Sequence, residues 1–322
     1  MTEIIKENNI DNNKKLLSET IGVLRFPLMV AVVLSHIFIP NIEGHLLVDI
    51  YNKYINSSFV YITVHLFFFI SGFLFFYGID KFGGVEYWIC LKKRIKRLVV
   101  PYLLWGTFIV GIRYLFYLLG QPDNIGLFSG GLKWFYHIVL FPINYQLWFV
   151  RDLFIVVLIS PLIYFLLKRL SFVFVIFLGV AWLCYHNNFF VLFGLEDFVR
   201  SKTILKLAGY DFISLFFFSF GAWFALFNKD FTLVFKRLFP ISIVLYLFCA
   251  TSRFILGDSF LVELFHRFAI LFGSISFITI VYMLVKKGKV KRNMFLEQGG
   301  QAIYYYHTIF LTYLLQAQSV PV

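Results

Sequence analysis

The chain has 322 residues and a mass of 37.9 kDa, with 60% hydrophobic residues, 14% charged residues and a mean hydropathy of +0.82. Soluble domains average about 45–50% apolar and about 25% charged residues, so this composition excludes a water-soluble globular protein, a disordered chain and a polar nucleic-acid-binding module. The length accommodates many bilayer crossings of about 20 residues each, and we expect an all-α, polytopic transmembrane helical bundle.

The N-terminal segment 1–19 is polar and rich in asparagine. We expect a loose cytoplasmic tail rather than a signal peptide, because no small-residue cleavage site follows the first apolar run. Apolar runs then predict nine spans, at residues 21–39, 58–77, 98–119, 147–167, 171–186, 211–227, 237–252, 262–285 and 302–316. A shorter run, 134–143, predicts a re-entrant or interfacial piece. The sequence therefore predicts nine to ten spans in one transmembrane domain, residues 20–318.

Lysine and arginine gather in alternate connections between these runs, which is the pattern of cytoplasmic loops. The richest connections are 78–97 and 286–299, whereas 40–57 and 120–146 carry one lysine each. This alternation predicts a cytoplasmic N-terminus and, with nine spans, an external C-terminus. The net charge of +12 is thus mainly a topology signal and not the mark of a nucleic-acid partner.

The first run contains a charged pair. A charge at the centre of a bilayer costs at least about 2.5–3.5 kcal/mol, so such residues are functional candidates. Arg25 and His36 share one helix face and are about 16 Å apart along the axis. A guanidinium below a titratable imidazole suits an anionic substrate whose reacting end lies deeper in the membrane. A snorkelling arginine and a histidine bonded to a neighbouring helix would explain the same spacing.

A basic motif, CLKKRIKRLVVPY, leads into the third run. Arg94 and Arg97 are neighbours on a helix, so their guanidinium groups can hold one phosphate or pyrophosphate. Lys93 lies beside them and joins this candidate set for phosphate binding. Ordinary positive-inside charge or contact with lipid headgroups would explain the same residues.

Other candidates lie in the outer halves of later runs. Trp148, Arg151 and Asp152 lie at the outer end of the fourth run, where an interfacial tryptophan and a self-neutralising ion pair would also account for them. Glu263 and His266 are three residues apart and can form an acid–base pair, or the carboxylate can simply satisfy a buried histidine. The remaining outer-half candidates are His65, Tyr304 and His307.

Several catalytic motifs are absent from the sequence. The patterns GxxxxGK[ST], HExxH and GxSxG do not occur, which argues against a P-loop ATPase, a zincin and a hydrolase with a nucleophile elbow. Cys90, Cys184 and Cys249 are far apart and form no CxxC pair. We therefore expect no disulfide framework and no metal site.

Taken together, these segments resemble the acyltransferase-3 family of bacterial integral-membrane acyltransferases. The similarity runs from about residue 20 to about residue 310, in the order of the family's motifs. The matching segments are LRFPLMVAVVLSH with Arg25 and His36, VHLFFFISGFLFF with Phe68, Phe69, Ser71, Gly72 and Phe73, RIKRLVVPY with Arg94, Arg97 and Pro101, QLWFVRDL, and IYYYHTIF with Tyr304 and His307.

The resemblance implies an O-acyltransferase of the bacterial inner membrane. It would move an acyl group, usually acetyl, from cytoplasmic acyl-CoA to a hydroxyl of a carbohydrate or lipid-linked glycan. Acetyl-CoA or another acyl-CoA would be the co-substrate, without a metal, and membrane lipids would surround the protein. A homo-oligomer is compatible with the sequence.

The resemblance also suggests roles for residues. His36 would be the catalytic histidine, as general base or acyl carrier, with Arg25 as its partner on the helix. Arg94 and Arg97 would contact the phosphates of CoA. The acceptor cleft would be shaped by outer residues, namely Trp148, Glu263, His266, Tyr304 and His307.

Two other functions fit part of the sequence. A transporter or flippase for a glycan or lipid would explain the bundle and the charges within it. It would not explain an anion clamp below a histidine on the first helix. A membrane sensor or structural subunit would leave both arginine groups without a ligand.

Overall fold

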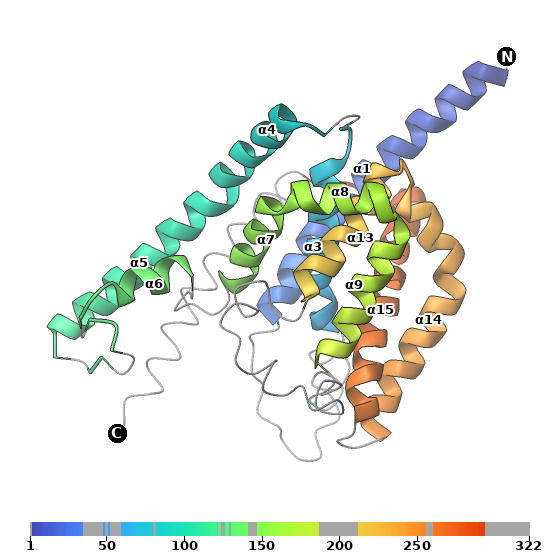
Figure 1. Cartoon of the computed structure of the whole chain (residues 1–322). Helices are drawn as coiled ribbons and strands as arrows, with labels where there is room; N and C mark the ends of the chain where they lie inside the picture. Colours follow the sequence, from blue (N-terminus) through green and yellow to red (C-terminus); the bar gives the residue numbers. More distant parts are fainter. Residues whose placement is uncertain are drawn as a thin grey trace.

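The computed structural model describes residues 2–34, 48, 51, 59–79, 82–120, 122–123, 126–128, 130–140, 147–186, 212–255 and 260–293. The elements found in this part of the chain are helices, so the expected all-α bundle is confirmed. They are α1 (Thr2–Leu34), α3 (Val60–Phe76), α4 (Gly84–Arg94), the π-helix η2 (Ile95–Val99), α5 (Val100–Leu118), α6 (Lys133–Val139), α7 (Trp148–Leu158), α8 (Ser160–Leu170), α9 (Phe172–His186), α13 (Ile213–Leu226), α14 (Phe231–Ile255) and α15 (Phe260–Lys286) (Figure 1).

Long apolar helices make this a membrane-spanning bundle. Within the described ranges, four helices are long and apolar enough to cross a bilayer, or five if α7 and α8 count as one broken span. The four are Asn12–Leu34, Gly84–Leu118, Phe231–Ser252 and Leu261–Lys286. The apolar helices α3, α9 and α13 are shorter, and the predicted run 302–316 lies outside the described residues.

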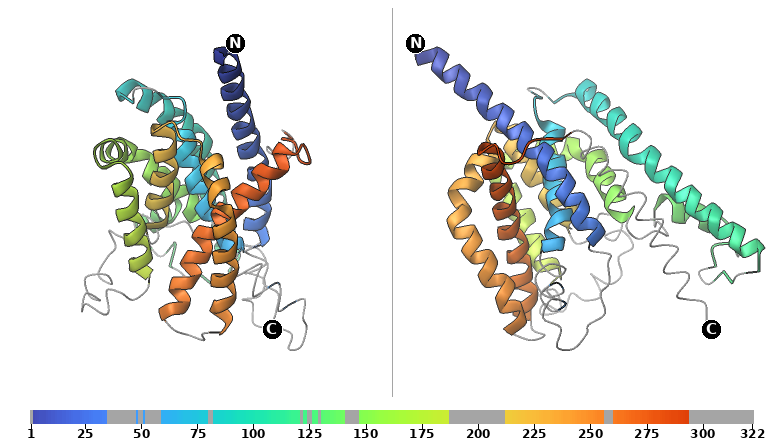
Figure 2. Two further views of the ribbon diagram at one scale, coloured as in Figure 1. Left: turned by 90° about the vertical axis from the view of Figure 1, so that its right-hand side faces the viewer. Right: turned by 180° about the vertical axis from the view of Figure 1, so that it is seen from behind.

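The N-terminal segment differs from the expected loose tail. Helix α1 begins at Thr2 and continues without interruption into the first apolar run. Its N-terminal half extends beyond the other helices, as both views in Figure 2 show. The asparagines of this segment therefore do not end the helix, and the cytoplasmic location of residues 1–19 stays a prediction.

The predicted connection 78–97 is also mostly helical. Helix α4 starts with Gly83, whose backbone N–H donates to Oε2 of Glu86 (3.0 Å). The chain then runs through η2 into α5, so that a helical segment of 35 residues from Gly84 to Leu118 replaces a loop followed by a span. The basic residues of this segment accordingly have fixed positions on a helix surface.

The predicted span 147–167 is broken. Helices α7 and α8 meet at Ile159 with a bend of 61°. Pro161 lies in the first turn of α8, where its missing N–H leaves no helical hydrogen bond unmade. At the far end of α8, Lys168 donates from Nζ to the carbonyl oxygen of Leu226 (3.5 Å), which ties α8 to the C-terminus of α13.

The short run 134–143 forms the seven-residue helix α6, as its length predicts. Two side chains hold its C-terminal end. The hydroxyl of Tyr102 donates to the carbonyl oxygen of Val139 (3.0 Å), and Nη1 of Arg151 donates to that of Leu140 (2.8 Å). The interfacial placement of this helix remains a prediction.

Helices α3 and α13 form the centre of the bundle and approach each other at two glycines. A Cβ added at Gly72 would overlap the carbonyl oxygen of Phe218, and one added at Gly221 would overlap that of Phe69. Small residues at such positions let transmembrane backbones pack closely. This contact explains why the segment FFISGF carries glycine at position 72. Phenylalanines of both helices then surround the crossing and fill the core.

The basic segments gather at one end of the bundle. The end of α3 and start of α4, helix α8, the α13–α14 turn and the end of α15 lie on the same side (Figure 1). We call this side the basic end. The alternation of charge along the sequence is thus matched in space, whereas its assignment to the cytoplasm stays a prediction.

Candidate functional site

Four arginines from three separate segments converge at the basic end. Arg25 on α1 lies close enough to Arg292 and Arg97 for their charges to repel. Arg94, at the end of α4, lies within electrostatic range of both Arg97 and Arg25. The structure thus brings together the arginines of the two sequence motifs and adds Arg292, which follows α15. We call these four residues the arginine cluster.

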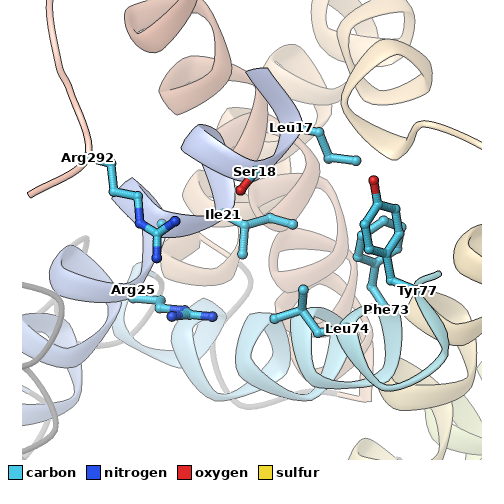
Figure 3. Close-up of a pocket in the computed structure, with 9 residues that line it drawn as sticks. Leu17, Ser18, Ile21, Arg25, Phe73, Leu74, Tyr77 and Arg292 are labelled. Atoms are coloured by element: carbon cyan, nitrogen blue, oxygen red, sulfur yellow. The ribbon is translucent and has the colours of Figure 1, made fainter. Parts of the chain in front are cut away.

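A small, open cavity of about 80 Å³ lies between α1 and α3 at this end (Figure 3). Its lining combines two cationic side chains with an apolar floor. The lining residues are Leu17, Ser18, Ile21, Gly22, Arg25, Phe73, Leu74, Tyr77 and Arg292. The cavity therefore joins the arginine of the first motif to Phe73, a residue of the second.

Gly22 provides the space for Arg292 at the edge of the cavity. A Cβ added at this position would stand 2.6 Å from Cδ and 2.8 Å from Nε of Arg292. Arg292 itself is exposed, while Arg25 is half-buried. Figure 3 shows Arg292 arriving from the segment after α15 and Arg25 reaching across from α1 towards Leu74. The two guanidinium groups therefore lie on the same side of the cavity.

The π-helix η2 sets the positions of the other two arginines. The N–H of Val100 donates to the carbonyl of Ile95, five residues earlier, and not four as in an α-helix. Pro101, the next residue, has no N–H and its ring crowds the carbonyl four residues before it, that of Arg97. A widened turn at this point accommodates both effects. Arg94 is half-buried beside the cluster and Arg97 is exposed.

Lys93 does not line the cavity, and three other predicted site residues lie outside the described part of the chain. Lys93 is exposed on α4. His36, Tyr304 and His307 lie outside the described residues, since α1 is described to Leu34 and the C-terminal part to residue 293. The catalytic role of His36 is therefore untested by the geometry.

A second polar group lies in the opposite half of the bundle. Arg267 of α15 is 3% exposed, donates from Nη1 to the carbonyl oxygen of Trp182 (2.7 Å), and places its guanidinium carbon 5.2 Å from that indole ring. His65 of α3 packs against the same ring (5.8 Å between centroids) and lies within electrostatic range of Arg267. We call Arg267, Trp182 and His65 the buried polar cluster.

Two predicted acceptor-side residues border this cluster. Glu263 is at the limit of ion-pair distance from Nη2 of Arg267 (4.0 Å). The ring of His266 meets that of Tyr61 edge-on, with 5.0 Å between centroids. The acid–base pair of Glu263 with His266 therefore stays a prediction.

The three candidates of the fourth run, Trp148, Arg151 and Asp152, lie on α7. Trp148 is half-buried and faces Phe68 of α3 at 6.5 Å. Arg151 and Asp152 form a buried ion pair (2.7 Å), which confirms the interpretation as a self-neutralising pair. Because Arg151 also holds the end of α6, this pair links α7 to that helix.

Sequence reasoning missed two arginines of these groups. Arg267 interrupts an apolar run. Because burying a charged side chain in a membrane span is costly, its position alone could have identified it as a candidate. Arg292 lies in a lysine-rich connection, where nothing in the local sequence separates it from its neighbours. Only the packing of that connection against Gly22 shows that it belongs to the cluster.

The arginine cluster can bind an extended anion. Like charges that converge repel one another, and several phosphate groups held by planar guanidinium forks would relieve this repulsion. Arg25 lies within electrostatic range of both Arg97 and Arg292, so positive charges from three segments lie near one another. A partly apolar cavity beside these charges suits a ligand with both phosphates and an uncharged arm.

Comparisons with known proteins agree with this chemistry. The sequence profile of the family described as "Acyltransferase domain" matches residues 19–320. The succinoglycan biosynthesis protein ExoH of Rhizobium meliloti (strain 1021) is 28% identical over 172 residues, covering 47% of this chain and 44% of that protein. The chain therefore matches less than half the length of this curated relative. No solved structure matches the chain.

Proposed function

This chain belongs to the acyltransferase family, and on that premise we propose that it is an acyl-CoA-dependent O-acyltransferase of the bacterial inner membrane. The donor is acetyl-CoA or another acyl-CoA on the cytoplasmic face. The acceptor is a hydroxyl of a cell-surface glycan or of a lipid-linked saccharide. The observation that carries the proposal is the convergence of arginines from α1, α4, η2 and the segment after α15 at the basic end, where two of them, Arg25 and Arg292, line a cavity.

The donor binds at the basic end in this proposal. Arg94 and Arg97 take the pyrophosphate of CoA, since neighbouring guanidinium groups match its oxygen atoms. Arg25 belongs to the same row of charges and lies on the helix that leads towards His36. The pantetheine arm then follows α1 and places the thioester about 16 Å further along its axis, the rise that eleven helical residues provide.

His36 performs the transfer. Its neutral imidazole takes the proton of the acceptor hydroxyl, whose oxygen attacks the thioester carbonyl and expels the CoA thiolate. The thiolate then accepts a proton. An acyl-imidazole intermediate on His36 is the alternative order of the same bond changes. Both orders require one histidine and no metal.

The acceptor enters from the opposite face. Glu263 and His266 lie beside the buried polar cluster in that half of the bundle, and Trp148 lies on α7. We place Tyr304 and His307 there as well, from their motif. The relative ExoH is named for succinoglycan biosynthesis, which supports a polysaccharide as the acceptor class.

Labelled donor tests this function. Inside-out membrane vesicles that contain the protein receive acetyl-CoA labelled in the acetyl group, and label is followed into the lipid and glycan fractions. We expect incorporation with the wild-type protein and with the control His137→Ala, which removes a histidine on α6. We expect none with His36→Ala, although that protein is still present in the membrane.

Two outcomes would count against the proposal. Robust incorporation by His36→Ala would remove the catalytic role of that residue. A wild-type protein that moves an acceptor across the membrane without changing its mass would favour the transporter interpretation, which the family match already makes the weaker one.

A further inference from the structure

The cavity between α1 and α3 has a pair of arginines of its own. Arg94 and Arg97 do not line it, whereas Arg25 and Arg292 do. Its remaining lining includes the polar side chains of Ser18 and Tyr77. The basic end thus has two adjoining parts, a pair of arginines on α4 and η2 and a cavity with its own two arginines.

The position of Arg292 along α1 indicates which part of a ligand it meets. Its side chain lies against Gly22, three residues before Arg25, which is about 4.5 Å further from the end of α1 that leads to His36. The reacting thioester lies towards that end in the proposed function. Arg292 is therefore beside the part of the donor that is most remote from the reaction.

The donor carries a phosphate at that remote position. In a CoA thioester the chain runs from the thioester through pantetheine and pyrophosphate to an adenosine with a phosphate on its ribose. We infer that Arg292, with Arg25, forms a second phosphate subsite that binds the ribose 3′-phosphate of acyl-CoA in this cavity. The inference rests on the proposed donor and adds a residue that selects CoA from its dephosphorylated form.

The chemistry of the cavity supports this assignment. A phosphate monoester carries up to two negative charges, which two guanidinium groups match in charge and in hydrogen-bond geometry. The cavity holds about 80 Å³, which suits a phosphate group rather than the whole nucleoside, so the neighbouring adenosine would lie outside it. Because Arg292 is exposed at the rim, its replacement removes a ligand contact without opening a core.

The test compares acetyl-CoA with acetyl-3′-dephospho-CoA. Wild-type protein should show a KM roughly tenfold or more higher for the dephospho donor, the effect of losing a charge-assisted hydrogen bond. Arg292→Gln should raise KM for acetyl-CoA to a similar extent, leave its KM for the dephospho donor unchanged and leave kcat within about twofold. Lys291→Gln removes the neighbouring exposed charge and should behave as wild type. An Arg292→Gln protein that still prefers acetyl-CoA by the wild-type ratio would overturn the inference.

Lipid headgroups also carry phosphate, so the same assay is repeated in vesicles of neutral lipid and of neutral lipid mixed with an anionic phospholipid. The inference requires that the Arg292→Gln effect is the same in both membranes and specific to the 3′-phosphate donor. An effect that appears only with anionic lipid, and equally on both donors, would assign the cavity to a lipid headgroup and overturn it.

Direct binding separates this inference from the proposed function. Radiolabelled CoA and 3′-dephospho-CoA are titrated onto the purified full-length protein in detergent. Preferential binding of CoA that depends on Arg292, without any acyl transfer, would support the 3′-phosphate subsite and contradict the proposed acyltransferase activity. Equal affinity for the two ligands would defeat the subsite whether or not transfer occurs.

Discussion

The two groups of arginine in this bundle have opposite surroundings. At the basic end, arginines from three segments converge beside a cavity and repel one another. In the buried polar cluster, Arg267 is enclosed by a backbone carbonyl, an indole face and the carboxylate of Glu263. In the first group the positive charges lie close to one another, whereas in the second the charge of Arg267 is compensated within the protein. We expect the first group to serve an anionic ligand and the second to serve the fold.

The largest expected effect comes from breaking the contact that supports both groups. Gly72→Leu would drive a side chain into the backbone of α13 at Phe218. Since α3 carries His65 near one end and Phe73 near the other, both groups would lose their support, and we expect no folded protein after extraction. Gly111→Leu is the matched control, because a Cβ at that position meets nothing within 4 Å. Size-exclusion chromatography in detergent measures the outcome. A monodisperse Gly72→Leu protein would show that α3 and α13 can move apart at Gly72 without unfolding the bundle.

Two substitutions, one in each group of arginines, test this difference in surroundings. Arg267→Met removes a buried charge-assisted hydrogen bond and should cost about 2 kcal/mol, which lowers Tm by about 3 °C in a protein of this size. Arg25→Gln removes one of several mutually repelling charges, so Tm should stay or rise while donor KM increases by about tenfold or more. Thermal unfolding in detergent and initial rates measure both variants. An equal loss of stability in the two variants would show that the arginine cluster and Arg267 contribute alike to the fold.

A smaller effect is expected from the turn that positions Arg97. Pro101→Ala restores a backbone N–H and permits a regular α-helix in place of η2. Arg94 and Arg97 would then rotate relative to Arg25. We expect donor KM to rise about threefold to tenfold, because the misplaced guanidinium groups would lose part of the binding free energy of one charge-assisted hydrogen bond. Pro240→Ala, within α14, serves as control. Unchanged KM in Pro101→Ala would show that the widened turn has no part in donor binding.

The sequence predicted the elements that rest on continuous apolar runs. The runs 58–77, 211–227 and 262–285 correspond to α3, α13 and α15 within a few residues, because an uninterrupted apolar stretch in a bilayer has few alternatives to a helix. Family membership was also predicted from ordered motifs and is confirmed by the profile match.

Prediction failed where charge or proline altered a helix. Basic residues made 78–97 resemble a loop, although a charged helix at a membrane surface is equally stable when its polar face meets water. Pro161 was a visible signal for the break at Ile159. For the site, local spacing joined Arg94 to Arg97, but only tertiary packing brings Arg25 and Arg292 to them. His36, Tyr304 and His307 remain predictions.

The brevity of α13 has a consequence for group transfer between compartments. Its fourteen residues rise about 21 Å, less than the roughly 30 Å hydrocarbon core of a bilayer. This helix packs at the centre of the bundle against α3, so a span shorter than the bilayer lies in the most buried part of the described structure. In the function proposed above, with donor and acceptor on opposite faces, a short central span would leave an acyl chain less distance to cover than the full hydrocarbon core.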